Sequence, residues 1–199
     1  EYIMTQNPNK MKNSKKCFPL DIEKKMKISI DTNGKIIFLN DYFLEFTDYN
    51  ISELVLKDIT EIMDEEMPIS IQNKLLELTD LYDKFYFIIK GQTKENTCYW
   101  GFARISPRIN QSNEITGHMV EVKTLPSVAI DNTKKLFEIL KEIENNAGIG
   151  AANKYLEGWL EEKHLDFYNF ILKMVQVNEK NANKYFELGN QSKKKKSWF

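Results

Sequence analysis

The sequence predicts an α+β fold, in which a five-stranded antiparallel sheet carries helices on one face and is followed by a small C-terminal α-helical module. Two observations lead to this prediction. Apolar and polar residues alternate over strand-length segments before residue 40 and again between residues 84 and 124. Helical spacing of apolar residues fills the stretch between these strands and returns after residue 126. The inserted helices can bury the apolar face of the sheet.

The first two strands are predicted to form a hairpin. Apolar side chains alternate over residues 26–30, and an apolar run follows at 36–39. Gly34 tolerates the positive φ that a tight turn between them needs. Asn40 or Asp41 can then cap a helix by accepting an amide hydrogen bond, and Pro68 suits the first turn of a longer helix. Helices are therefore expected between residues 40 and 84.

Three strands complete the predicted sheet. One covers residues 84–90, and a long hairpin covers residues 94–126. Within the hairpin, alternation places Tyr99 and Ile105 on one face and Trp100 on the other. An isolated two-stranded hairpin is marginal in water, so the flanking strands should be its partners.

The C-terminal part is predicted to hold three amphipathic helices. Apolar residues recur at helical spacing over 136–143, 152–160 and 167–175. Such stripes can pack on one another as a small bundle or antiparallel pair. Two interpretations stay open: a self-contained appendage, or an output element that passes a state to a partner or to a second copy.

Four segments are expected. They are a flexible N-terminal arm (1–20), a central domain (21–126), the helical module (127–189) and a basic tail (190–199). The tail could contact an anionic membrane weakly, although charge runs more often stay solvated. No run of apolar residues is long enough for a transmembrane segment.

Composition narrows the possible partners and the compartment. The chain has 28 basic and 29 acidic side chains and a formal charge of -1, which gives no reason to expect nucleic-acid binding. Cys17 and Cys98 fit no metal or redox spacing. We expect two free thiols in a reducing cytoplasm and no structural disulfide.

Several separate motifs, in order, support a more specific assignment over residues 18–126. They are FPLD at 18–21, DTNGKIIFLNDYF at 31–43, Met67-Pro68, KENTCYW at 94–100, Pro107 and GHMVEVKTLPS at 117–127. In these motifs the chain resembles the PAS sensor of the aerotaxis receptor (Aer) family and of bipartite bacterial energy-taxis systems. The order of strands and helices is also that of a PAS domain.

The resemblance implies a cytoplasmic sensor that holds FAD and reports its redox state to a membrane chemoreceptor or another signalling protein. It also makes a homodimer the expected oligomer. The candidate cofactor-binding residues are Asn40, Met63, Phe85, Tyr99, Trp100 and Met119.

The chain departs from the family at its cofactor motifs. Flavin-binding members carry Arg-His-Pro-Asp-Met-Pro before the long helix, whereas this chain reads Met63-Asp64-Glu65-Glu66-Met67-Pro68. A diphosphate there would meet like charge. Phe85 stands where the family has a tryptophan. The alternative is a cofactor-free PAS-derived dimerisation or adaptor module, in which Phe85, Tyr99, Trp100 and Met63 are ordinary packing residues.

No catalytic motif is found. His118 and His164 have no ligand partner nearby in the sequence, and no Gly-rich phosphate loop or nucleophile motif occurs. The adjacent carboxylates at 64–66 are expected to form a solvated acidic turn. We therefore expect a signalling protein and not an enzyme.

Overall fold

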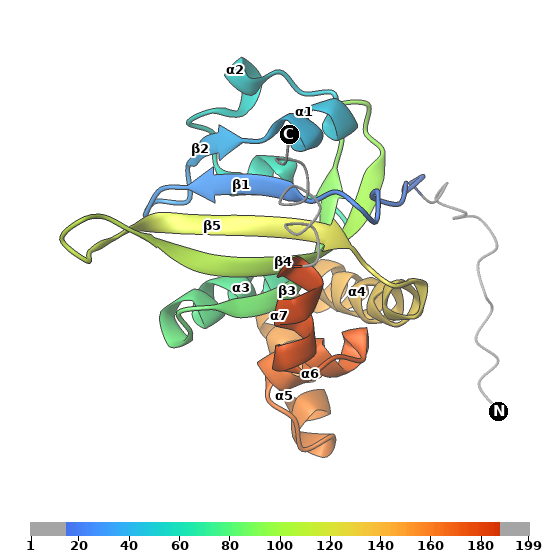
Figure 1. Ribbon diagram of the computed structural model, residues 1–199. Coiled ribbons are helices and arrows are strands. Elements are labelled where there is room, and N and C mark those ends of the chain that lie inside the picture. Colours follow the sequence, from blue (N-terminus) through green and yellow to red (C-terminus); the bar gives the residue numbers. More distant parts are fainter. Residues whose placement is uncertain (1–14, 188–199) are drawn as a thin grey trace, which may run out of the picture.

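The computed structural model describes residues 15–187. Their main feature is one antiparallel sheet with the strand order β2-β1-β5-β4-β3 (Figure 1). The strands are β1 (Met26–Ile30), β2 (Ile36–Leu39), β3 (Phe85–Gln92), β4 (Cys98–Ile109) and β5 (Ile115–Thr124). The predicted five-stranded antiparallel sheet is confirmed.

The helices between β2 and β3 cover one face of the sheet. They are α1 (Asp41–Thr47), α2 (Ile51–Leu54), the 3-10 helix η1 (Ile59–Ile62) and α3 (Ile69–Leu81). We call this the inner face; Tyr99 and Ile105 of β4 point into it. The outer face carries the alternate residues, among them Trp100 and Phe102. Asn40 caps α1 as predicted, because its side chain accepts a hydrogen bond from the Phe43 amide at 3.3 Å.

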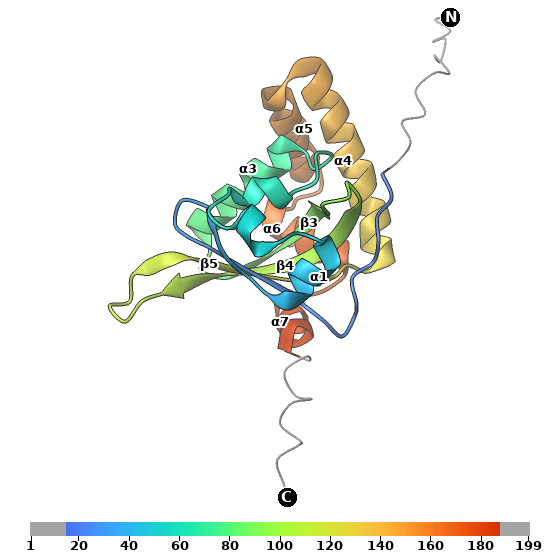
Figure 2. The same cartoon turned by 90° about the horizontal axis from the view of Figure 1, so that it is seen from above.

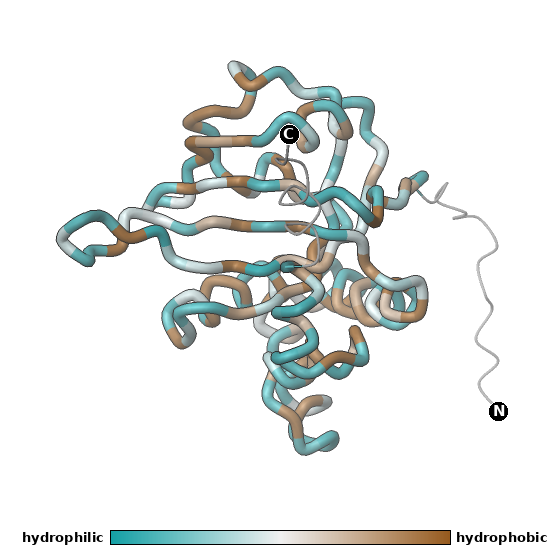
Figure 3. Tube along the Cα trace, in the orientation of Figure 1, coloured by the Kyte–Doolittle hydropathy of each residue, from teal (hydrophilic) through white to brown (hydrophobic). Residues whose placement is uncertain are grey.

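The β4–β5 hairpin is longer than the other strands and projects past them (Figure 1). Gly101 to Ile109 pair with residues 115–124, whereas β1 reaches only as far as His118. The projecting turn is hydrophilic (Figure 3). The turn therefore lies away from the core, and the functional site has to be sought at the other end of the hairpin.

Four helices follow the sheet, one more than predicted. They are α4 (Ser127–Ala147), α5 (Ile149–Glu162), α6 (Phe167–Val175) and α7 (Glu179–Glu187). Figures 1 and 2 show α3 and α7 on opposite sides of the sheet, with α5 and α6 beyond β3. The chain therefore wraps its C-terminal helices around one edge of the sheet.

These helices do not form a self-contained bundle. Phe137 of α4 lies 5.4 Å from Trp100, centroid to centroid, and Phe186 of α7 lies 5.6 Å from Phe102. The ring centroids of Phe167 in α6 and Phe87 in β3 lie 5.8 Å apart. The buried apolar residues of sheet and helices form a single cluster. The helical module thus completes the core of the sheet instead of forming a separate one.

The last turn of α7 is held by polar contacts to the sheet. Lys25 Nζ donates to the Phe186 carbonyl at 3.3 Å, and Lys123 Nζ donates to the Tyr185 carbonyl at 3.1 Å. Both carbonyls belong to the end of a helix, where they lack helical partners and where cations are favoured. The lysines therefore fix a short helix that has few apolar residues of its own.

The N-terminal arm is attached to β4 over its described part. The Cys98 amide donates to the Lys16 carbonyl at 3.0 Å, and the Phe18 amide donates to the Cys98 carbonyl at 2.8 Å. Cys17 and Cys98 form a disulfide, with Cα atoms 4.2 Å apart. The prediction of two free thiols is wrong, because pairing of the arm with β4 brings together cysteines that are 81 residues apart. The rest of the predicted arm and the predicted basic tail lie outside the described residues.

Candidate functional site

A small cavity lies between the inner face, η1 and α3. Its volume is about 110 Å³. Apolar side chains from six elements make up most of its lining, including Ile28, Ile62, Leu75, Ile89, Ile105 and Val120. Its shape therefore depends on η1 and α3 as well as on the sheet.

Four residues with polar side chains line the cavity, and one of them, Lys90, is held in ion pairs with Asp64 and Glu66. The other three are Thr79, His118 and Tyr99. The Thr79 hydroxyl already donates to the Leu75 carbonyl of its own helix at 2.9 Å. Burial lowers the pKa of His118, which favours the neutral imidazole. The third group is the hydroxyl of Tyr99.

Tyr99 is the best-defined polar residue of the cavity. It is 1% exposed, and its ring packs edge-on against Phe46 of α1, with centroids 5.6 Å apart. Its ring lies across Gly91, the opposite residue on β3, where any side chain would overlap it. Burial raises the Tyr99 pKa, and no hydrogen bond to its hydroxyl occurs among residues 15–187. The hydroxyl can therefore bind a polar atom of a ligand.

Three of the six candidate residues gather on the inner face. Met63 and Tyr99 line the cavity, and Met63 forms a β-bridge with Gly91. Phe85 is fully buried and is paired with Ile105, which also lines the cavity. A cofactor-binding role for these three residues stays a prediction of the resemblance.

Trp100 and Met119 lie on the other face of the sheet. Trp100 follows Tyr99 in the strand and packs against α4. Met119 precedes the cavity residue Val120, and its Sδ lies 3.6 Å from the Ser29 hydroxyl. Successive side chains of a strand point to opposite faces, so these two candidates cannot share a pocket with Tyr99.

Asn40 is occupied by backbone contacts. Besides capping α1, its Oδ1 accepts from the Lys27 amide at 2.8 Å and its Nδ2 donates to the Lys25 carbonyl at 3.0 Å. Its side chain therefore stabilises the junction of β1 and α1. It does not line the cavity.

An ion cluster follows Met63 and consists of Lys15, Asp64, Glu66 and Lys90. Asp64 is 1% exposed, and its carboxylate lies 2.8 Å from Lys15 Nζ and 3.2 Å from Lys90 Nζ. Lys90 also pairs with Glu66. The predicted solvated acidic turn is therefore wrong for Asp64, because two lysines from distant segments neutralise a carboxylate that the fold buries.

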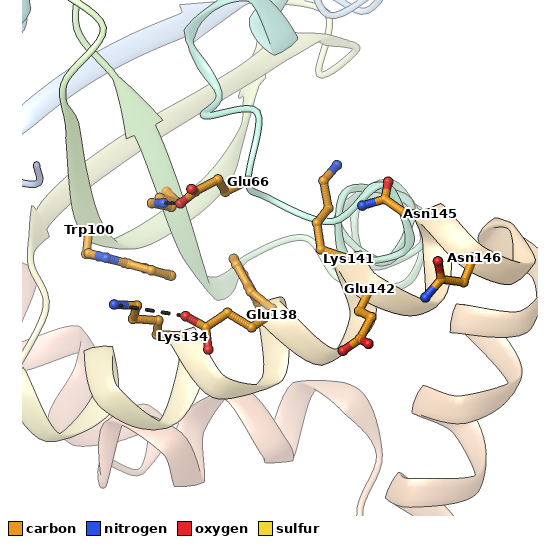
Figure 4. Close-up of a pocket in the computed structure, with 10 residues that line it drawn as sticks. Glu66, Trp100, Lys134, Glu138, Lys141, Glu142, Asn145 and Asn146 are labelled. Atoms are coloured by element: carbon orange, nitrogen blue, oxygen red, sulfur yellow. Dashed lines mark hydrogen bonds and ion pairs between the residues drawn. The ribbon is translucent and has the colours of Figure 1, made fainter. Parts of the chain in front are cut away.

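A larger groove borders this cluster on the other side (Figure 4). Its volume is about 590 Å³, and Trp100, Lys90, Glu66 and residues of α4 line it. Its three lysines are already paired: Lys90 with Glu66, Lys134 with Glu138 at 4.0 Å, and Lys141 with Glu144 at 3.7 Å. With both signs of charge present and the lysines paired, the groove has no clear preference for a charged ligand.

Glu144 connects α4 to the cavity helix α3. Its Oε1 accepts hydrogen bonds from the amide and the hydroxyl of Ser70, at 2.7 and 2.8 Å. Its Oε2 lies 3.7 Å from Lys141 Nζ, an ion pair too long for a hydrogen bond. The residue before α3 is Pro68, whose side chain cannot cap. Glu144 therefore supplies from another helix the anion that the first turn of α3 needs.

Glu121 marks the contact between the outer face and α7. Its carboxylate lies 2.6 Å from Lys25 Nζ and accepts a hydrogen bond from Arg104 Nε at 2.8 Å. Burial alone would raise the pKa of Glu121, but hydrogen bonds from the two basic residues outweigh it and lower the pKa. Arg104 in turn lies 5.1 Å from the ring centroid of Phe186.

Comparison with known proteins agrees with this geometry. The PAS domain family matches residues 26–123. This range begins with β1 and ends at the penultimate residue of β5, so it contains nearly the whole sheet and the helices of the inner face. Residues 26–123 have the PAS fold.

Solved structures similar to the chain include other PAS domains. A light-oxygen-voltage domain studied with a flavin analogue has 15% identity and a TM-score of 0.48, and the alignment covers 61% of this chain and 88% of that one. The PAS domain of a Colwellia psychrerythraea protein has 13% identity, a TM-score of 0.46 and coverages of 51% and 86%. The PAS domain of the fruit-fly ELK potassium channel has 14% identity and a TM-score of 0.45, and the alignment covers 50% of this chain and 85% of that one. A search of curated proteins found no match.

The cavity of this PAS domain does not fit FAD. Pockets that bury drug-sized ligands have volumes of about 300–1,000 Å³, whereas this one has about 110 Å³. Met63 and Asp64 stand in place of the family's arginine and histidine. Asp64 and the nearby Glu66 are neutralised by lysines, so this segment brings no free positive charge for a diphosphate.

Two features are absent from residues 15–187: a grouping of metal ligands and a helix that could span a bilayer. Over residues 15–187, no three His, Cys, Asp or Glu side chains are grouped as metal ligands would be. In the same range, no helix has both the length and the apolar character needed to cross a bilayer.

Proposed function

We propose that this protein is a non-catalytic signal-transduction sensor whose PAS cavity takes a small, mainly apolar ligand with one polar group. The observation that supports this most directly is the hydroxyl of the buried Tyr99, which has no hydrogen-bond partner among residues 15–187 and belongs to a mainly apolar cavity. A cavity of about 110 Å³ suits a molecule of benzene size or smaller, since an engineered apolar cavity of about 150 Å³ binds benzene.

The signal leaves the cavity through α3. Leu75, Leu76 and Thr79 of this helix line the cavity, and its first turn is capped by Glu144 of α4. A ligand that shifts α3 would therefore change the contact with α4. The ligand would then bind two arrangements of α3 and α4 with different affinities, and a sensor requires such a difference.

The output is proposed to pass to a separate protein. The motif resemblance to energy-taxis sensors suggests a membrane chemoreceptor and a cytoplasmic location, with a homodimer as the working form. A pull-down with chemoreceptor components and a sedimentation measurement test these proposals directly.

A second candidate is the cofactor-free adaptor, and the small size of the cavity favours it. In that case residues of the cavity serve packing alone, and Tyr99 carries an unused hydroxyl. The two candidates differ in whether the cavity binds anything.

Binding of benzene and phenol to the purified full chain distinguishes them. We expect both to raise the melting temperature, and phenol to bind more tightly because its hydroxyl can pair with Tyr99. Tyr99→Phe should keep benzene binding and weaken phenol binding by about three- to tenfold, the value of one hydrogen bond. Leu75→Phe, which fills the cavity, should abolish both.

Absence of a shift with either compound would favour the adaptor. Flavin absorption bands that persist after desalting would contradict the small-ligand proposal and support a flavin sensor. A ligand effect that Leu75→Phe leaves unchanged would place binding outside this cavity.

A further inference from the structure

The disulfide and the ion cluster tie the same short segment to the domain. Cys17 is bonded to Cys98, and two residues earlier Lys15 pairs with the buried carboxylate of Asp64. The side chains of Lys15 and Asp64 are 9% and 0% exposed. Without the arm, Asp64 would keep only Lys90 as a cation. The arm therefore acts as a strap that completes the neutralisation of a buried charge.

Asp64 is also part of the wall of the cavity. Its amide donates to the Lys90 carbonyl at 2.9 Å, and the preceding Met63 pairs with Gly91 and lines the cavity. Gly91 lies under the ring of Tyr99. The contacts thus run from the strap through Asp64 and Met63 to the polar group of the cavity.

The two cysteines differ in exposure. Cys17 is partly exposed, whereas Cys98 is fully buried. Of the two, Cys17 is therefore the residue that a thiolate from solution would approach. Thiol–disulfide exchange requires attack on an accessible sulfur.

We propose that Cys17–Cys98 is a redox-active site that a dithiol reductant opens, and that its opening releases the strap from Asp64. The thiolate of the dithiol attacks the Cys17 sulfur; the bond to Cys98 breaks, and Cys98 leaves as a thiolate that takes up a proton. The second thiol of the reductant then attacks the mixed disulfide and releases Cys17 as a thiol. The dithiol is oxidised to its disulfide by two electrons, and a disulfide oxidant reverses the reaction.

Release follows from how little else holds the strap. After reduction, residues 15–18 keep two backbone hydrogen bonds to Cys98, the Lys15–Asp64 pair and the packing of Cys17 against the core, and the next anchor along the chain is the buried Leu20. Segments with few contacts open locally without unfolding of the whole protein. The redox state of the site is thereby transmitted to Asp64 whether or not the cavity holds a ligand.

The test is thiol labelling and hydrogen exchange on the folded full chain, with dithiothreitol as the dithiol. Before reduction, a maleimide should label neither cysteine; after reduction it should label both, because strap release exposes Cys98. Exchange at the Phe18 and Asp64 amides should become about tenfold faster or more. Exchange at Ala103, in the centre of β4, should stay slow.

Two variants serve as controls. Cys17→Ser should show fast exchange at Asp64 that dithiothreitol no longer changes. Lys15→Met should keep the disulfide, speed exchange at Asp64 and leave Phe18 protected, which separates loss of the ion pair from loss of the bond.

Several results would overturn the proposal. One is a disulfide that dithiothreitol does not reduce in the folded protein; another is a purified protein whose thiols stay free in oxidised dithiothreitol. Labelling of Cys17 alone would show that the strap stays docked, and fast exchange at Ala103 would mean global opening. None of these results bears on ligand binding in the cavity.

Discussion

Removal of the Glu144 carboxylate should uncouple α3 from α4 and destabilise the protein. In Glu144→Ala, the amide and the hydroxyl of Ser70 lose their acceptor. Ser70 is fully buried and the Glu144 side chain is 5% exposed, so water replaces the carboxylate poorly. Each hydrogen bond to a charged group contributes about 1.5–3 kcal/mol. We expect the free energy of unfolding to fall by about 3–5 kcal/mol, the lower part of the range applying where water enters.

Urea denaturation followed by circular dichroism measures this loss. Glu144→Gln keeps an acceptor but loses the charge, and its free energy of unfolding should fall by about 1–2 kcal/mol. Glu142→Ala removes an exposed carboxylate from the same turns of α4 and should have little effect. If Glu144→Ala is within about 0.5 kcal/mol of the wild type, the proposed cap is not what holds the first turn of α3.

Three further changes test other parts of the structure. Cys17→Ser should lower the free energy of unfolding by about 4 kcal/mol in urea, because the disulfide closes a loop between residues 81 apart; an unchanged midpoint would contradict this. Glu121 has a lowered pKa, so its stabilisation is present above the ordinary glutamate pKa and is lost as pH falls through the folded-state value. When urea denaturation is repeated at a series of pH values, the free energy of unfolding should therefore fall more steeply towards acid pH in the wild type than in Glu121→Gln. Gly91→Ala should displace the ring of Tyr99, cost about 1–3 kcal/mol and weaken phenol binding, whereas full retention of both would mean that the ring can move aside.

The elements of the sheet could be predicted because their signals are local. Alternation over 26–30 and 94–126 reflects side chains that point in turn to the two faces of the sheet, and Gly34 does adopt a positive φ of 77° in the first turn. The helix α7 was missed because only Ala182 and Phe186 are buried along its length, which is too few for a recognisable stripe.

The structure brings together part of the candidate site. Tyr99, Met63 and Phe85 are on the inner face, and a cofactor-binding role for them stays a prediction. Trp100 and Met119 are not, and the alternation of the strands already excluded them: each is adjacent in sequence to a residue that points into the cavity. Gly91 could have been noticed as the small residue opposite an aromatic one, but only once the register of β3 and β4 is known.

The remaining features depend on tertiary proximity. Cys17 meets Cys98, Lys15 meets Asp64 and Glu144 meets Ser70 across 81, 49 and 74 residues. No spacing rule links such pairs, because the fold alone decides which segments touch. The predictions of free thiols and of a solvated acidic turn rested on how such residues usually behave. They could not include the partners that the fold brings to Cys17, Cys98 and Asp64.

These long-range contacts converge on the segment from Met63 to Ser70. At one end Met63 lines the cavity, next to it Asp64 is held by the strap, and at the other end Ser70 is capped by α4. This is also the segment in which the chain departs from the flavin-binding motif. Lysines neutralise Asp64 and Glu66 of this segment. Met63, Asp64 and Ser70 tie the segment to the cavity, to the N-terminal strap and to α4. The proposed ligand and the proposed change at the disulfide would therefore act on the same few residues, which contact α4 through Ser70.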